Sequence, residues 1–248
     1  EAAKEAGLGI GALCALIQAG AFEGFTQSRS KVVYEAQLWN LLTMREKRYA
    51  NKYGDKYKFD LVKLVKDLLK LPDEKNKPII KESRFETLKK KSSPYLKIYT
   101  LNKKSENFAN WFYEKNLLGY TYGKTLKDIF STKRNGLMPV NEVEDLPVRS
   151  RVLMVARIED DPQQGKSREK GNKYMRMMVG DETSSIKVMI FNDKLEDCIR
   201  INNGVPEKKQ IVVIKGTKFE DVVFADLISV QDNKVYTKLS EIEKNIEA

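Results

Sequence analysis

Residues 174–191 read Tyr-Met-Arg-Met-Met-Val-Gly-Asp-Glu-Thr-Ser-Ser-Ile-Lys-Val-Met-Ile-Phe, and they set the architecture of the second half of the chain. Strand-forming residues fill 174–179 and 186–191, and residues 180–184 between them have the composition of a turn. Successive side chains of a strand point to opposite faces, so Tyr174, Arg176 and Met178 should share one face. The stretch therefore predicts two strands joined by a short turn.

Three more strands are expected around this pair. Residues 148–158 alternate in a strand-like pattern, and residues 210–216 and 222–230 supply two further strands. A polar loop is expected over 160–172 and a short helix over 192–202. Five strands with a helix between the third and the fourth are the topology of the OB fold, a small Greek-key barrel.

The first half of the chain has helical patterning instead. Helices are expected over 11–22, from 30 to about 49, over 61–69 and over 106–118, and the third should end before Pro72. The lysine-rich stretch 72–106 contains Pro78 and Pro94, so loops with short helices are expected there. The fold class is therefore α+β, with an all-α N-terminal region followed by the barrel.

Composition narrows the possible functions of this 248-residue chain. It has no histidine and no Cys-x-x-Cys motif, which argues against a structural zinc site and excludes histidine-dependent catalysis. Cys14 and Cys198 are expected to be buried free thiols in a reducing cytoplasm. The sequence has no signal peptide and no apolar run of about 20 residues, so neither secretion nor a membrane is expected. Because it starts with Glu1, we expect a fragment or a processed or tagged product.

The positive charge is concentrated in one region. Residues 26–105 contain 21 Lys and Arg against nine Asp and Glu, a net charge of +12, whereas the rest of the chain sums to −2. Such a region attracts phosphate backbones or anionic surfaces. The alternative is a solvated helical face neutralised by counterions. We favour nucleic acid, because other signals in the sequence agree with it.

Three motifs occur in an order that resembles a known family. They are Ala15-Leu16-Ile17 with Gly20-Ala21-Phe22, then Glu114-Lys-Asn-Leu-Leu-Gly-Tyr120, then the 180–191 segment. Similar strings occur in the C-terminal region of bacterial replicative DNA polymerase III alpha subunits. The segment 122–126 lacks the family's His-Pro, Ser184 replaces a turn glycine, and residues 46–105 match nothing in the family. These departures favour a divergent member of the family, bacterial or phage-encoded.

The resemblance implies an order of domains and a role. Residues 1–50 would be a helix-hairpin-helix-like region, 51–147 a basic helical linker, 148–235 the OB-fold domain and 236–248 a tail that is either a short polar helix or disordered. The family's catalytic aspartates, which hold magnesium, lie in a more N-terminal domain, and nothing here resembles them. We therefore expect no catalytic residue, metal site or cofactor in this chain. Its role would be to hold DNA, both duplex and single-stranded.

Two groups of residues are candidates for duplex binding. Gly7, Gly9 and Gly11 would let backbone N–H groups approach a phosphate at a helix N-terminus, and Lys4 would assist. The alternative is a plain glycine-rich turn. In the basic region, the run Lys89, Lys90 and Lys91 is the candidate for tracking the duplex backbone.

The barrel offers candidates for single-strand binding. OB folds bind single strands on the face of their second and third strands and in two adjoining loops. The candidates are the loop residues Lys166, Arg168 and Lys170, the strand residues Tyr174, Arg176 and Lys187, and Lys218, which we expect in the other loop. Few aromatic residues are evident on this face. A barrel kept for structure or for protein contacts therefore stays open as the alternative.

A third candidate is the pentamer at residues 37–41. Replicative polymerases dock on a sliding clamp through a similar motif, in which Gln37, Leu38 and Leu41 would enter a groove. The same leucines also fit the buried stripe of a helix, and we favour that interpretation. Two other functions remain open for the chain. They are an RNA-binding OB module of the tRNA-binding type, and a scaffold that recruits a clamp or another replisome subunit. No small-molecule substrate is indicated.

Overall fold

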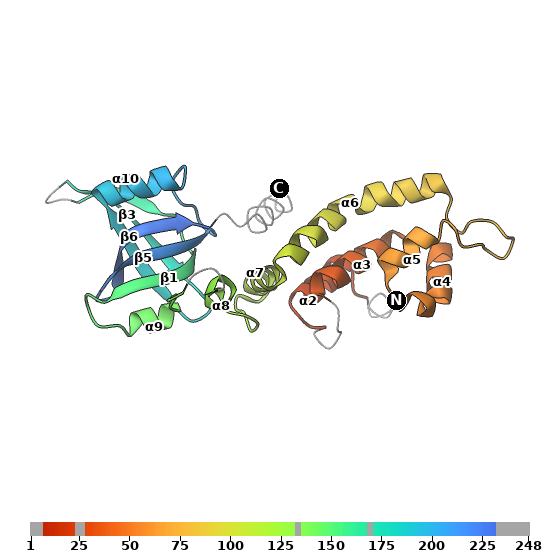
Figure 1. The fold of residues 1–248 in the computed structure, drawn as a ribbon, viewed down its shortest axis with the longest axis horizontal. Coiled ribbons are helices and arrows are strands. Elements are labelled where there is room, and N and C mark those ends of the chain that lie inside the picture. Colours follow the sequence, from red (N-terminus) through yellow and green to blue (C-terminus); the bar gives the residue numbers. More distant parts are fainter. Residues whose placement is uncertain (1–6, 23–27, 132–134, 168–170, 232–248) are drawn as a thin grey trace. The chain divides into compact units, whose positions relative to one another are not determined.

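The computed structural model describes residues 7–22, 28–131, 135–167 and 171–231, and it contains two compact units (Figure 1). The helical unit includes the residues up to Gly119, and the barrel unit begins at Tyr120. Within the described residues, no helix combines the length and the apolar character needed to cross a membrane. The predicted division of the chain at residues 50, 147 and 235 into four segments stays a prediction.

The barrel unit is a closed sheet, as predicted. Its main strands are β1 (Arg151–Ile158), β3 (Lys173–Gly180), β4 (Ser185–Phe191), β5 (Ile211–Phe219) and β6 (Val222–Val230). Neighbouring strands follow the order β1-β5-β6-β4-β3, and β1 also pairs with β3, which closes the barrel. Helix α10 (Asn192–Ile201) connects β4 to β5. This is the OB fold, and the α+β class is confirmed.

The predicted loop over 160–172 is partly wrong. Gln163–Lys166 form an extra strand, β2, which pairs antiparallel with the start of β3. The four residues Gln-Gln-Gly-Lys have no apolar alternation, because no side of β2 packs into the core. Only the pairing with β3 makes this segment a strand, and the sequence pattern does not show such a pairing.

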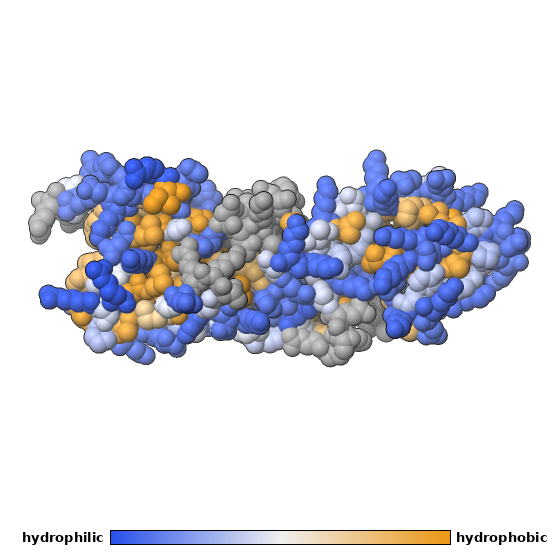
Figure 2. Space-filling view, in the orientation of Figure 1, coloured by the Kyte–Doolittle hydropathy of each residue, from blue (hydrophilic) through white to orange (hydrophobic). Residues whose placement is uncertain are grey.

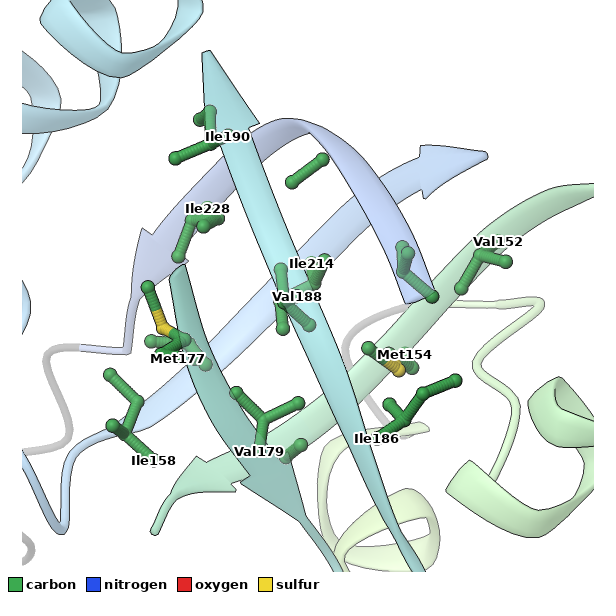
Figure 3. Packing of buried hydrophobic residues seen from close by; sticks show 14 of the residues in the cluster. Val152, Met154, Ile158, Met177, Val179, Ile186, Val188, Ile190, Ile214 and Ile228 are labelled. Atoms are coloured by element: carbon green, nitrogen blue, oxygen red, sulfur yellow. The ribbon is translucent and has the colours of Figure 1, made fainter. Parts of the chain in front are cut away.

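One face of each barrel strand packs into the hydrophobic core, and the opposite face forms the outer surface of the barrel. Alternate residues of each strand point inward, among them Met177, Val188 and Ile214 (Figure 3). Leu195 and Cys198 of α10 complete this core, as do valines of the short helix α9 (Val140–Glu144). Burial of apolar surface stabilises the barrel by about 25 cal/mol for each Å² removed from water. The other alternate residues form the outer face of the sheet.

The helical unit is built from several helices and one 3-10 turn. They are α2 (Ile10–Gln18), α3 (Arg29–Leu41), α4 (Met44–Tyr53), η1 (Asp55–Tyr57), α5 (Leu61–Asp67), α6 (Glu82–Lys104) and α7 (Glu106–Leu118). The predicted helices over 61–69 and 106–118 are confirmed as α5 and α7. The helix predicted over 11–22 is shorter than expected and ends at Gln18, before Gly20, whose φ is +88°.

The single helix predicted from 30 to 49 is wrong. The chain leaves the helical conformation at Leu42, and Thr43 starts α4 with a capping box. The Thr43 side chain accepts a hydrogen bond from the Glu46 backbone N–H, and the Glu46 carboxylate accepts one from the Thr43 backbone N–H. The Thr-x-x-Glu spacing is the sequence signal for this break.

The loops predicted over 72–106 are also wrong for most of that stretch, because α6 runs through Pro94. A proline inside a helix removes one backbone hydrogen bond, here to the carbonyl of Lys90. Both residues are exposed, so water can satisfy that carbonyl. The helix is held instead by its packing, since Leu88 is buried in the core of the unit and Tyr99 stacks on Tyr34 of α3.

Candidate nucleic-acid interface

The outer face of the barrel carries three aligned cross-strand pairs. The register of β3 and β4 places Tyr174 opposite Phe191, Arg176 opposite Met189 and Met178 opposite Lys187. All six side chains point away from the core, since the residues between them are the buried ones. The predicted residues Tyr174, Arg176 and Lys187 therefore share one surface.

Four aromatic rings form a continuous row across this face. The ring centroids of Tyr174 and Phe191 are 6.3 Å apart, those of Phe191 and Phe224 5.5 Å, and those of Phe224 and Phe219 4.8 Å. The four residues belong to β3, β4, β6 and β5 in the order of the sheet, and all are partly exposed. We call this set the aromatic row. Its geometry offers ring faces and edges to a flat, unsaturated ligand.

Three members of the aromatic row were not identified from the sequence. Phe191 could have been found by alternation, because it lies two and four residues from Met189 and Lys187. Phe219 and Phe224 flank the short β5–β6 turn, where no local pattern reveals their neighbour. They meet Phe191 only because β4 pairs in parallel with β6, which places Met189 opposite Phe224.

The strand β2 borders the aromatic row on one side. Gly165 lies opposite Tyr174, and a Cβ atom at that position would be 2.7 Å from the tyrosine hydroxyl oxygen. The phenol ring therefore crosses over Gly165, where any larger residue would displace it. Gln163 in the same strand accepts two hydrogen bonds from the Arg176 guanidinium, at 2.9 and 2.6 Å. The short strand thus positions both predicted residues of β3.

Three cations around the aromatic row are paired with carboxylates, whereas Arg176 is hydrogen-bonded to the Gln163 amide. Asp226 pairs with Lys194 and Arg151, while Lys187 lies 3.7 Å from Asp221. The hydrogen bond from Lys194, followed by the nearby positive charge of Arg151, lowers the pKa of the Asp226 carboxyl. These pairs reduce the positive charge that the surface offers to phosphate. On the face shown in Figure 2, hydrophobic and hydrophilic residues are interspersed over both units.

The predicted loop position of Lys218 is wrong. It lies within β5, is buried, and its ammonium donates hydrogen bonds to the carbonyl oxygens of Glu144 at 2.7 Å and Leu146 at 3.3 Å. Lys218 thus ties the end of α9 to the barrel, and we leave it out of the proposed interface. Lys166 is exposed on β2, whereas Arg168 and Lys170 fall outside the described residues.

The basic candidates of the helical unit are exposed on α6. Lys89 lies 3.7 Å from Glu86 in an exposed pair, which adds little stability. Lys90 and Lys91 have no carboxylate within ion-pair distance in the described parts of the chain. These lysines are therefore available to phosphate, on a regular helix and not in the predicted loop.

The glycine candidates lie at the start of α2. Gly7 has φ of +77°, Gly9 is the N-cap of the helix and Gly11 is in its first turn. All three are exposed. Lys4 and most of the segment that would contain the preceding helix of a hairpin lie outside the described residues. Phosphate binding at these glycines stays a prediction.

The clamp-motif candidates belong to the core of the helical unit. Leu38 is buried, Leu41 packs against the same cluster, and Gln37 donates a hydrogen bond to the Cys14 sulfur at 3.3 Å. The residues therefore form the buried stripe that we favoured. The two cysteines are buried free thiols, as predicted, and burial raises the pKa of each.

Comparisons with known proteins identify no family for this chain. No family model and no curated protein matches the chain. Among solved structures, an SSB domain from Synechococcus sp. is 11% identical over 34% of this chain and 98% of that chain, with a TM-score of 0.27. The mitochondrial single-stranded DNA-binding protein Rim1 of S. cerevisiae is 14% identical over 34% of this chain and 97% of that chain, with a TM-score of 0.29.

A third solved structure has a similar extent of likeness. It is the second OB-fold domain of replication protein A from Methanococcus maripaludis, 16% identical over 36% of this chain and 92% of that chain, with a TM-score of 0.28. At these identities the likeness concerns the fold alone. What the barrel binds has to be argued from its own surface.

Proposed function

We propose that the barrel unit binds single-stranded DNA on the outer face of β3, β4, β6 and β5. The observation that carries the proposal is the aromatic row, which runs across four strands and is flanked by Arg176 and Lys187. Bases stack on aromatic side chains whatever their sequence, because every base has a π-face. Duplex DNA keeps its bases stacked on one another, so this surface favours single strands.

The chain as a whole fits a part of a larger DNA-processing protein. We propose that it is the non-catalytic C-terminal part of a replicative DNA polymerase, in which the helical unit holds duplex DNA through Lys89, Lys90 and Lys91. The three sequence motifs support this proposal. In the structure, the Leu-Leu-Gly string ends α7 at Gly119, whose φ is +79°, and the 180–184 segment connects β3 to β4.

The direct test is single-strand binding by variants of the aromatic row. Fluorescence anisotropy of a labelled oligothymidine is measured against the whole chain and against Phe191→Ala and Phe224→Ala. Because one base–aromatic stack is worth about 1–3 kcal/mol, each variant should bind about 5- to 150-fold more weakly. Duplex binding of the same variants should stay within about twofold.

The control is Tyr120→Ala, which removes an exposed aromatic side chain outside the barrel strands. Thermal unfolding of each variant verifies that the barrel is intact. Unchanged oligothymidine binding by both phenylalanine variants, or an equal loss in Tyr120→Ala, would contradict the proposal. A parallel titration with oligouridine tests the RNA-binding alternative, which predicts a preference for RNA.

A further inference from the structure

A concave site lies in the helical unit, among α2, α3, α4 and α5. The groove has a volume of about 620 Å³, within the range of ligand-binding pockets. Its floor is aliphatic and buried, with Ile17, Leu61 and Leu64, while Leu8 and Phe59 at its edge are exposed. Trp39 also lines it. Neither the aromatic row nor the α6 lysines belong to this groove.

Phe59 is held at the groove in an unusual conformation. Its φ is +56° and that of Lys58 is +51°, so two successive residues other than glycine are left-handed. This backbone region is unfavourable for residues with a side chain, and such strain clusters at functional sites. The Phe59 N–H donates to the Gly54 carbonyl at 2.9 Å, and its ring lies over Gly54, yet the residue is 65% exposed.

The lining of the groove selects apolar groups. Its polar side chains are few: Asn40, Asn51, Lys47 and Glu35. The Glu35 carboxylate already accepts a hydrogen bond from the Leu61 N–H at 3.1 Å and lies 3.8 Å from the Lys31 ammonium. The aliphatic floor offers neither donors nor acceptors to the edge of a nucleobase, whose buried polar groups would then be unsatisfied. Aliphatic or aromatic side chains carry no such cost.

The surroundings of the groove select negative charge. The segment 44–59 contains six Lys and Arg but only Glu46 and Asp55 as acids, and Glu46 is buried against Arg84. Lys47 lies over the Trp39 ring, 5.5 Å from its centroid. Arg45 of this segment is exposed and pairs with Asp73 at 2.7 Å. No carboxylate of a described residue lies within ion-pair distance of the other four exposed cations, Arg48, Lys52, Lys56 and Lys58.

We propose that this groove binds an acidic amphipathic helix of a partner protein. Apolar residues at i, i+3, i+4 and i+7 of that helix would enter the groove, with Phe59 and Trp39 packing on them. Its carboxylates would face the cations of α4 and η1. The same charges that attract DNA elsewhere in the helical unit would here select the partner, and like-charged helices would be rejected.

The probe is a labelled peptide of about 16 residues, with leucine at i, i+3, i+4 and i+7 and glutamate on the opposite face. We expect it to bind the whole chain with a dissociation constant on the order of 10 µM. Versions with serine for leucine, or with lysine for glutamate, should bind at least tenfold more weakly. Binding should also change the tryptophan fluorescence, because Trp39 lines the groove whereas Trp111 is buried in the core.

Two variants locate the binding site. Phe59→Gly removes the ring but suits the positive φ, so the fold should persist while peptide affinity falls at least tenfold. The matched control is Leu16→Ala, an exposed apolar residue of α2 that is not among the groove-lining residues. Equal binding by the wild type and Phe59→Gly, or no binding of the acidic peptide, would overturn the proposal. Displacement of the peptide by oligothymidine, together with weaker oligothymidine binding by Phe59→Gly than by Leu16→Ala, would assign the groove to nucleic acid instead.

Discussion

The two units differ in how the charges on their surfaces are arranged, and on the proposed function they would hold DNA in different ways. The helical unit has an excess of cations, and several of them, such as Lys90 and Lys91, have no carboxylate partner among the described residues. The barrel unit pairs Arg151, Lys187 and Lys194 with acids and carries the aromatic row on its outer face. The net charge of the sequence therefore points to only one of the two candidate surfaces, the α6 lysines. It does not point to the aromatic row, because base stacking needs aromatic rings and no excess of cations.

The largest expected change in DNA affinity concerns the lysines of α6 in the helical unit. Reversal of Lys89, Lys90 and Lys91 to glutamate should weaken duplex binding about 10- to 100-fold at moderate salt. Each lost phosphate contact should also reduce the slope of log affinity against log salt by about 0.9. Anisotropy titrations with a labelled duplex at several salt concentrations measure both quantities.

The control for this reversal is Lys124→Glu with Lys208→Glu, two exposed lysines of the barrel unit. This double variant should change duplex affinity by less than about threefold, the general effect of lower net charge. Duplex binding that is unaffected by the triple reversal would remove the α6 lysines from the account.

A second prediction separates structural cations from binding cations. Lys218→Met leaves the carbonyl groups of Glu144 and Leu146 without their donor, so the barrel should lose about 1–3 kcal/mol of stability. Single-strand affinity should stay unchanged under conditions where the barrel is folded. Chemical denaturation measures the loss, with the exposed Lys208→Met as the matched control. A stable Lys218→Met protein with weaker DNA binding would return Lys218 to the interface.

The sequence predicted more of the barrel than of its surface. Alternation identified the strands around the core, because each strand has one buried and one exposed face, as in Met175 and Arg176. It missed the aromatic row, whose phenylalanines converge only through the parallel pairing of β4 with β6. Proline usually ends a helix, but packing carries α6 through Pro94. By contrast, the sequence contains the Thr43 capping signal for the start of α4.

A smaller change in single-strand affinity is expected when two cations of the barrel lose the carboxylate with which they pair. Asp226→Asn removes the carboxylate that neutralises Arg151 and Lys194, so single-strand affinity at low salt should rise about two- to fivefold. The salt dependence of single-strand binding should become steeper, which brings the barrel closer to the behaviour of the helical unit. Anisotropy with oligothymidine at two salt concentrations tests this. A fall in affinity would mean that Asp226 contributes to the ligand site.

The smallest effect concerns acid stability. Burial opposes ionisation of Glu46, but the hydrogen bonds from Arg84 and Thr43 outweigh it and lower its pKa. The pKa values of Asp60 and Asp73 are lowered too, so the unfolded helical unit binds protons first and stability falls as pH falls through these values. Burial raises the pKa of Glu35, which acts in the opposite direction.

Among the described residues, the three lowered carboxyls of the helical unit outnumber the one in the barrel, Asp226. The helical unit should therefore unfold at a slightly higher pH than the barrel. Tryptophan fluorescence reports only the helical unit, since Trp39 and Trp111 are the two tryptophans of the chain. Its acid transition should precede the loss of the β signal in circular dichroism, and the reverse order would count against this assignment of ion pairs.

The central claim is that the two units hold DNA by different physics. The most direct test is the salt dependence of wild-type binding to a duplex and to oligothymidine, measured side by side. The account predicts a steeper slope for the duplex than for the single strand, because most cations around the aromatic row are already paired with carboxylates and neutralise fewer phosphates. An equally steep slope for oligothymidine would show that phosphate neutralisation governs both, and would contradict the role assigned to the aromatic row.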